Sequence, residues 1–170
     1  MKKKFYITTA IDYIDDVMHI GHAYQKIVAD VLARYHRLLG EKVFFLTGVD
    51  EHGGKAEEAA KKAKVGFKKW ANKISQADKE QFQSLNISYD RFIRTTDKDH
   101  EKTVINFWHR VKKKGDIYLG KFVGIYCQGC EGFITEKDLV KGKCPYHPTK
   151  TPRKLTEKTT FSAGQNMKIF

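Results

Sequence analysis

The chain has 170 residues, of which 41% are apolar and only 3 are Pro, so it has room for one core-forming domain, or for one domain with a small appendage, and wholesale disorder is not expected. No apolar run approaches the ~18–20 residues of a membrane span, and the short apolar stretch at the N-terminus does not resemble a signal peptide, so we expect a cytoplasmic protein with no membrane segment. The net charge of +12 is uneven: residues 1–60 hold 8 Lys/Arg against 9 Asp/Glu, whereas residues 61–170 hold 24 against 11, which suits either a polyanion partner or a merely soluble lysine-rich surface.

The first elements in chain order predict a β-α-β unit. Residues 5–10 are apolar and β-prone, and residues 43–48 form a short apolar run typical of a buried parallel strand. Between them, large apolar residues recur at steps of three and four over residues 20–39, which predicts a helix that ends at Gly40. Strand, helix and strand in this order predict a parallel sheet with a right-handed crossover.

Further elements follow before the character of the sequence changes. We expect helices over 53–64 and 67–84, a strand over 91–95, and a helix from about 97 to 114. The inner face of this last helix should carry Val104, Phe107, Trp108 and Val111. After it, glycine becomes frequent, short strands are expected and all three Cys appear, so we place a module boundary near residue 115.

The loop after the first strand carries a candidate anion site, His19-Ile20-Gly21-His22. A helix begins here, and its free N–H groups and positive dipole end attract anions. His19 and His22 are one turn apart, so both imidazoles can donate to phosphate oxygens, and Gly21 leaves room for close approach. Such a short pattern also arises by chance or from a core histidine, but its place after the first strand of a β-α-β unit favours a site.

A second polar loop, Asp50-Glu51-His52-Gly53, follows the second strand and should face the same crevice. Asp50 and Glu51 are candidate anchors for a ligand ammonium group. The alternative is an ordinary polar loop with a helix cap.

The cysteines predict a metal site. Cys127 and Cys130 are followed after 13 residues by Cys144 and His147, so two knuckles each hold two ligands three residues apart. Four such ligands suit a closed, tetrahedral structural zinc site. A redox Cys-x-x-Cys is the alternative, but it leaves the second knuckle unexplained. A zinc ion would supply folding free energy to a module poor in large apolar residues.

The order of these patterns resembles bacterial-type methionyl-tRNA synthetases. The matching segments are Thr8–Tyr13, His19–Tyr24, Ala29–Tyr35, Phe45–Gly53, Leu85–Asp90, Phe92–Thr96, Lys114–Tyr118 and the cysteine knuckles. The resemblance covers nearly the whole chain to about residue 150. It implies that the fold is α/β, with the first half of a Rossmann-type (HUP-like) parallel sheet over 1–115 and a zinc-binding connective insertion over 116–170.

The resemblance also implies an activity: methionine is activated by ATP, with Mg²⁺, to methionyl-adenylate and transferred to the acceptor end of tRNA(Met). It makes His19 and His22 the catalytic histidines that stabilise the ATP phosphates. The implied ATP-binding set is Thr9, His19, Gly21 and His22. The implied methionine-binding set is Ala10, Ile11, Tyr13, Asp50 and His52. The implied zinc ligands are Cys127, Cys130, Cys144 and His147.

Three residues depart from the family pattern. Ala10 replaces a common Pro, Asp12 stands where Pro or an aromatic residue is usual, and Met18 replaces a frequent Pro. The resemblance further implies that the KMSKS loop, the second half of the catalytic domain and the anticodon-binding domain lie outside this sequence. We therefore also expect self-association or a separate C-terminal half as a partner. The alternative function is a non-catalytic, basic, zinc-containing module that binds tRNA or a protein.

Overall fold

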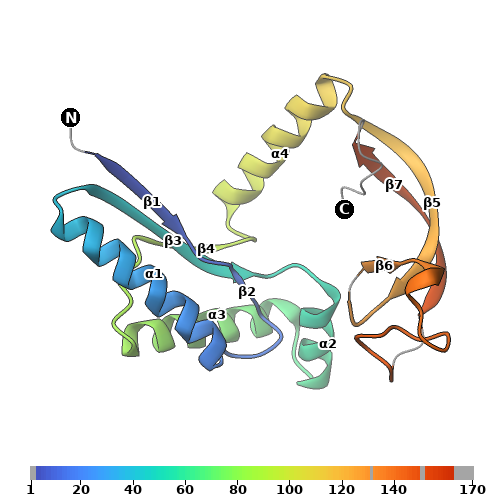
Figure 1. Cartoon of the computed structure of the whole chain (residues 1–170), viewed down its shortest axis with the longest axis horizontal. Helices are drawn as coiled ribbons and strands as arrows, with labels where there is room; N and C mark the ends of the chain where they lie inside the picture. Colours follow the sequence, from blue (N-terminus) through green and yellow to red (C-terminus); the bar gives the residue numbers. More distant parts are fainter. Residues whose placement is uncertain (1–2, 131, 150–151, 163–170) are drawn as a thin grey trace. The chain divides into compact units, whose positions relative to one another are not determined.

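The computed structural model describes residues 3–130, 132–149 and 152–162 (Figure 1). The chain divides into two compact units, residues 1–101 and residues 102–170, which are described separately. The division falls inside helix α4 (Lys98–Lys113), and the module boundary expected near residue 115 stays a prediction. Part of the expected insertion, at residues 131, 150–151 and 163–170, lies outside the described residues.

The first unit is built on a parallel sheet. Its strands are β1 (Lys4–Thr8), β2 (Asp12–Tyr13), β3 (Lys42–Asp50) and β4 (Arg91–Arg94). Leu46 of β3 pairs with Thr8 on one side and Arg91 on the other, so β1 and β4 flank β3. The short strand β2 continues along the β1 side, where Asp12 pairs with Val49. This confirms the predicted α/β fold with a parallel sheet, although β2 itself was not predicted.

One face of this sheet is covered by helices. Figure 1 shows α1 (Ile20–Leu38) and α3 (Phe67–Ser84) on the same side of the strands, and α2 (Gly54–Lys62) lies beside α3. The core between the layers centres on the fully buried rings of Phe45 and Phe82. None of the helices in the described part of the chain is long and apolar enough to cross a membrane.

The buried face of helix α1 is not the face that carries its large apolar residues. Its large apolar residues are exposed, with Ile20 at 88% and Leu38 at 87% of their surface. The buried positions are Lys26, Ala29, Asp30 and Ala33. Small alanines let the helix approach the sheet closely, and the two charged residues find partners there.

Helix α4 likewise exposes residues that were expected on an inner face. Val104 and Phe107 are exposed, whereas Trp108 and Val111 are half-buried. The helical span itself agrees with the predicted one.

The second unit contains an antiparallel sheet, ordered β6-β5-β7. Its strands are β5 (Ile117–Cys127), β6 (Gly132–Ile134) and β7 (Arg153–Ser162), with a short 3₁₀ turn at Glu136–Asp138. The expectation of short strands is wrong for β5 and β7, which have 11 and 10 residues. Their β-branched and aromatic residues favour extended structure, so β5 continues through the glycines at 120 and 124.

The adjacent residues Phe44 and Phe45 give a test of this core. Phe45→Ala should lower the free energy of unfolding by about 3–5 kcal/mol, because it leaves a cavity between the sheet and α1. Phe44→Ala, on the opposite face and 45% exposed, should cost less than about 1 kcal/mol. Urea unfolding followed by tryptophan fluorescence measures both. Equal losses would contradict the assignment of the buried face.

Candidate functional site

His19 and His22 form a reciprocal cap at the N-terminus of α1. The Nδ1 of His19 accepts from the Gly21 N–H at 3.1 Å, and the Nδ1 of His22 accepts from the His19 N–H at 3.4 Å. The two rings stack with centroids 3.8 Å apart. A neutral imidazole that accepts at Nδ1 carries its proton on Nε2. This cap therefore leaves two Nε2–H donors at the positive end of a helix, as an anion site requires.

Gly21 gives the His19 ring of this cap its space. A Cβ at this position would lie 3.0 Å from Cε1 and 3.2 Å from Nδ1 of His19. A side chain here would therefore require the imidazole to move by a few tenths of an ångström.

Helix α3 holds the residue that precedes the histidines. The buried carboxylate of Asp78 accepts from the Met18 N–H at 3.1 Å, and Gln81 Nε2 donates to the Met18 carbonyl at 3.2 Å. Burial raises the pKa of Asp78, and the charge of Asp12 adds to the rise, while the Met18 N–H and the charge of Lys26 oppose it. The sequence pattern gave no signal for Asp78, which follows the helical period without being apolar.

The carboxyl ends of β1 and β3 bring the two predicted loops to one edge of the sheet. The hydroxyl oxygens of Thr9 and Thr47 are 2.8 Å apart, and Tyr13 is the register partner of Asp50. The Asp50 carboxylate accepts from the His52 N–H at 3.1 Å. Ala10, Ile11 and His52 are exposed beside them.

Glu51 is not available as an anchor for a ligand, contrary to expectation. Its fully buried carboxylate accepts from Arg94 Nε at 2.6 Å, from Ser75 Oγ at 2.9 Å and from the Thr96 hydroxyl. Burial alone would raise the pKa of Glu51, but these hydrogen bonds and the Arg94 charge hold it below its usual value. Glu51 thus ties β3 to α3 and β4, and Asp50 alone faces the loop edge as a half-buried carboxylate.

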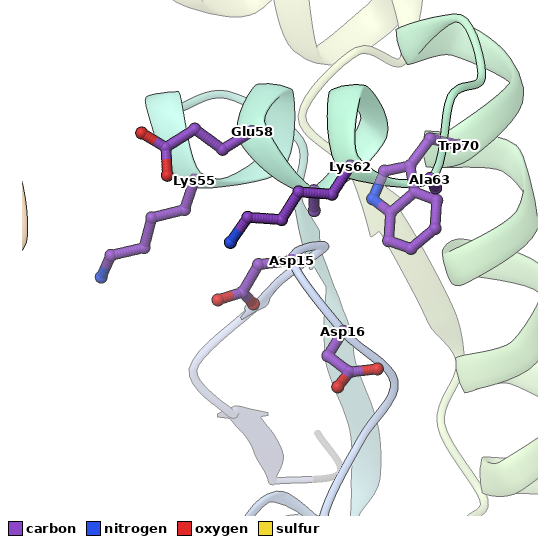
Figure 2. A pocket seen from close by; sticks show the side chains of 8 residues that line it. Asp15, Asp16, Lys55, Glu58, Lys62, Ala63 and Trp70 are labelled. Atoms are coloured by element: carbon purple, nitrogen blue, oxygen red, sulfur yellow. The ribbon is translucent and has the colours of Figure 1, made fainter.

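Two hollows flank the loop that leads into α1. One, of about 250 Å³, is lined by Tyr13, Asp15, Asp16, Val17, His19 and His22. It brings Tyr13 together with both histidines. The other, of about 540 Å³, lies between Asp15 and Asp16 on the loop, Trp70 on α3, and the charged face of α2 (Figure 2). Neither of these two hollows is lined by Ala10, Ile11, Asp50 or His52.

The second unit gathers the four predicted metal ligands. The three sulfurs and a ring nitrogen of His147 all lie within 4.8 Å of one another. The Cys130 sulfur is 3.4 Å from that of Cys144 and 3.2 Å from His147 Nδ1. A Cβ on Gly129 would lie 2.4 Å from the His147 ring, so only glycine lets the ring close the cluster.

The close approach of the cysteine sulfurs shifts the pKa values of two of them. Hydrogen bonding to the Cys144 sulfur, burial and the nearby Cys127 raise the pKa of Cys130 to about 12. Burial also raises the pKa of Cys127, but N–H groups of the Cys127–Cys130 knuckle and the neighbouring thiols lower it overall. Three sulfurs with one imidazole are the ligand set of a tetrahedral zinc site, so the cluster is compatible with a bound zinc ion.

Comparison with known proteins places the chain in a family. Residues 5–162 match the family model for tRNA synthetases class I (M). The chain is 48% identical over 145 residues to a methionine–tRNA ligase of Caldanaerobacter subterraneus subsp. tengcongensis, covering 85% of this chain and 23% of that protein. It is 44% identical over 160 residues to the methionine–tRNA ligase of Thermotoga maritima, covering 93% and 25%.

A solved structure shows the same likeness. Mycobacterium tuberculosis methionyl-tRNA synthetase in complex with methionyl-adenylate superposes with a TM-score of 0.85 and 42% identity, over 93% of this chain and 32% of that one. The chain thus spans about a quarter of the length of the curated relatives it matches, and about a third of the solved one.

Glu51 gives a pH-dependent prediction. Because its pKa is lowered in the folded state, the carboxylate stabilises the fold above the ordinary value of 4.5, and this contribution is lost as the pH falls below it. Glu51→Gln should therefore cost about 1–3 kcal/mol of unfolding free energy at pH 7 and less below pH 4.5. Urea unfolding at a series of pH values measures this. The exposed control Glu57→Gln should show no such convergence, and a constant deficit in Glu51→Gln would contradict the assignment.

Proposed function

The chain belongs to the tRNA synthetases class I (M) family, and we propose that it carries the part of a methionine–tRNA ligase that binds methionine and ATP and forms methionyl-adenylate. The observation that supports this best is the reciprocal histidine cap, which presents two ring N–H donors at the start of α1. The hollow that His19 and His22 share with Tyr13 gives a ligand a place beside them.

In the proposed reaction, a methionine carboxylate oxygen attacks the α-phosphorus of ATP, which enters with Mg²⁺. The new O–P bond forms as the bond to the leaving pyrophosphate breaks, and negative charge shifts onto the phosphate oxygens. His19 and His22 are the catalytic residues, because their Nε2–H groups and the helix N-terminus stabilise that charge without moving during the reaction. Thr9 and Gly21 complete the ATP-binding set, Thr9 through its hydroxyl and Gly21 by leaving space.

We assign methionine to the loop edge formed by β2 and the end of β3. The Asp50 carboxylate holds the ammonium group, and Ala10, Ile11, Tyr13 and His52 line the binding surface. The pairing of Tyr13 with Asp50 supports this assignment, since it sets an aromatic ring beside the only carboxylate among these five residues.

The Cys₃His cluster is proposed to hold a structural zinc ion through Cys127, Cys130, Cys144 and His147. When bound, the ion would stabilise the fold of the connective insertion, assigned to residues 116–170 after a catalytic half-domain at 1–115. The macromolecular partner is the acceptor end of tRNA(Met), whose terminal ribose hydroxyl attacks the methionyl carbonyl of the adenylate, so that an ester forms and AMP leaves. The excess of Lys and Arg in residues 61–170 supports a polyanionic partner.

A further partner is assigned to the open side of the sheet. In the described part of the chain β1 pairs along one edge only, and the apolar face of α1 is exposed. We propose that these surfaces accept the second half of the catalytic domain, whether from the same polypeptide or from a separate one.

Methionine-dependent ATP–pyrophosphate exchange tests the proposed activity. The chain should support slow exchange, and His19→Ala and His22→Ala should each lower the rate by about 10²–10³, as removal of a single transition-state donor does elsewhere. His109→Ala, an exposed histidine of α4, is the matched control and should leave the rate unchanged. Exchange that is unaffected by the first two changes would contradict the catalytic assignment and favour the non-catalytic alternative.

Metal binding tests the cysteine cluster. One equivalent of Zn²⁺ or Co²⁺ should bind per chain with release of protons, and Co²⁺ should show the absorption of a tetrahedral thiolate site. Cys130→Ser and Gly129→Ala should both weaken binding, the second because its Cβ displaces the His147 ring. A stoichiometry of zero, or full affinity in both variants, would contradict the assignment.

A further inference from the structure

Lys26 of α1 is a fully buried lysine whose ammonium group has no free donor. Its Nζ donates to the Ala10 carbonyl at 2.8 Å and to Gln25 Oε1 at 3.0 Å, and it lies 2.9 Å from each carboxylate oxygen of Asp12. An ammonium group has three N–H donors, so these partners use all of them. A buried charge is tolerated only when it is paired and hydrogen-bonded, which confines Lys26 and its partners to one arrangement.

These contacts fix the segment over residues 10–13. Lys26 reaches back from the second turn of α1 to the loop that precedes the helix, and its two loop partners, Ala10 and Asp12, flank Ile11. Asp12 in turn pairs with Val49 of β3, so the ion pair links α1 to the sheet through β2. Tyr13 follows directly, as the register partner of Asp50.

The rest of the loop is held in the same way by other side chains. Three donors reach loop carbonyls spaced four residues apart: Lys26 to Ala10, Trp70 to Ile14 at 2.6 Å and Gln81 to Met18 at 3.2 Å. Lys26 is the charged member of this set and holds the end nearest β1. The other two hold the end that leads into the histidine cap.

We propose that Lys26 is a positioning residue that fixes the backbone of residues 10–13 and thereby sets the affinity for methionine. The link to methionine rests on the proposed function, which gives Ala10, Ile11 and Tyr13 their roles. Lys26 has no exposed surface and therefore acts through the loop and not on the ligand.

The double variant Lys26→Met with Asp12→Asn separates a positioning role of Lys26 from a purely structural one. Lys26→Met alone leaves Asp12 buried and unpaired, so this variant should lose stability whether Lys26 positions the loop or only stabilises the fold. Lys26→Met with Asp12→Asn leaves no uncompensated charge, so most of the lost stability should return. It still lacks the donor to the Ala10 carbonyl, so the loop should stay loose if Lys26 positions it.

The experiment compares the parent chain, the single Lys26→Met variant and the double variant by ¹⁵N NMR. Amide hydrogen exchange at Asp12 and Tyr13, the two residues of β2, reports the order of the loop without any ligand, and chemical shifts on addition of L-methionine report affinity. Arg37→Met is the matched control, because Arg37 lies on the same helix but bonds to Ser88 and Asp90.

The double variant should exchange about tenfold faster at residues 12 and 13 and bind methionine about tenfold more weakly, which matches the loss of about one hydrogen bond. Exchange at Phe45 in the core should stay at the parent rate, and Arg37→Met should change neither loop exchange nor affinity. Should the double variant not fold, Asp12→Asn alone, which keeps the bond to Ala10, should show a smaller change in the same direction.

Loop exchange and methionine affinity equal to the parent values in the folded variants would overturn the proposal. A parent chain that shows no methionine-dependent shifts would instead overturn the proposed function and the link to methionine. The exchange rates alone would then decide whether Lys26 fixes the loop.

Discussion

The reciprocal cap between His19 and His22 is the constraint around which the first unit is arranged. The N–H groups at the start of a helix need hydrogen-bond partners. Here the imidazoles of His19 and His22 accept from the N–H groups of Gly21 and His19, which leaves their own Nε2–H groups free to donate. An aspartate cap would satisfy the same N–H group but offers no donor, and a serine cap offers only a short O–H close to the backbone. The same residues thus end the loop, begin the helix and supply the proposed catalytic donors.

Buried charges behind the loops keep that geometry rigid. Asp78, Lys26 and Glu51 are all buried, and each bonds to a loop near the carboxyl edge of the sheet or to the residues beside it. Apolar residues at these positions would pack as well, but they could not bond to the Met18 N–H or the Ala10 carbonyl. A buried charged group is stable only when its hydrogen-bond partners stay in place, so these contacts fix the positions of the loops that form the candidate site.

Much of this architecture could be predicted from the sequence, and the misses have physical causes. The β-α-β order, the helical spans and the grouping of the three cysteines with His147 follow from local patterns in the sequence, and tertiary contacts do not change them. The buried side of α1 could not be predicted, since hydrophobic periodicity assumes that large apolar residues face inward, and here Ala29 and Ala33 do. Lys26 and Asp78 give no signal in the sequence, because a buried charge is recognisable only once its partner, distant along the chain, is known. Glu51 was misjudged for the same reason: Arg94 lies 43 residues away.

The central claim is that the histidine cap and the adjoining loop edge form the site for methionyl-adenylate. The most direct measurement is the ¹⁵N spectrum of the histidine side chains during titration with a non-hydrolysable methionyl-adenylate analogue. The Nε2 resonances of His19 and His22 should shift together and saturate, while those of His109 and His147 stay in place. Saturable binding that leaves both cap histidines unshifted, or that perturbs only the hollow at Lys55 and Lys62, would contradict the claim.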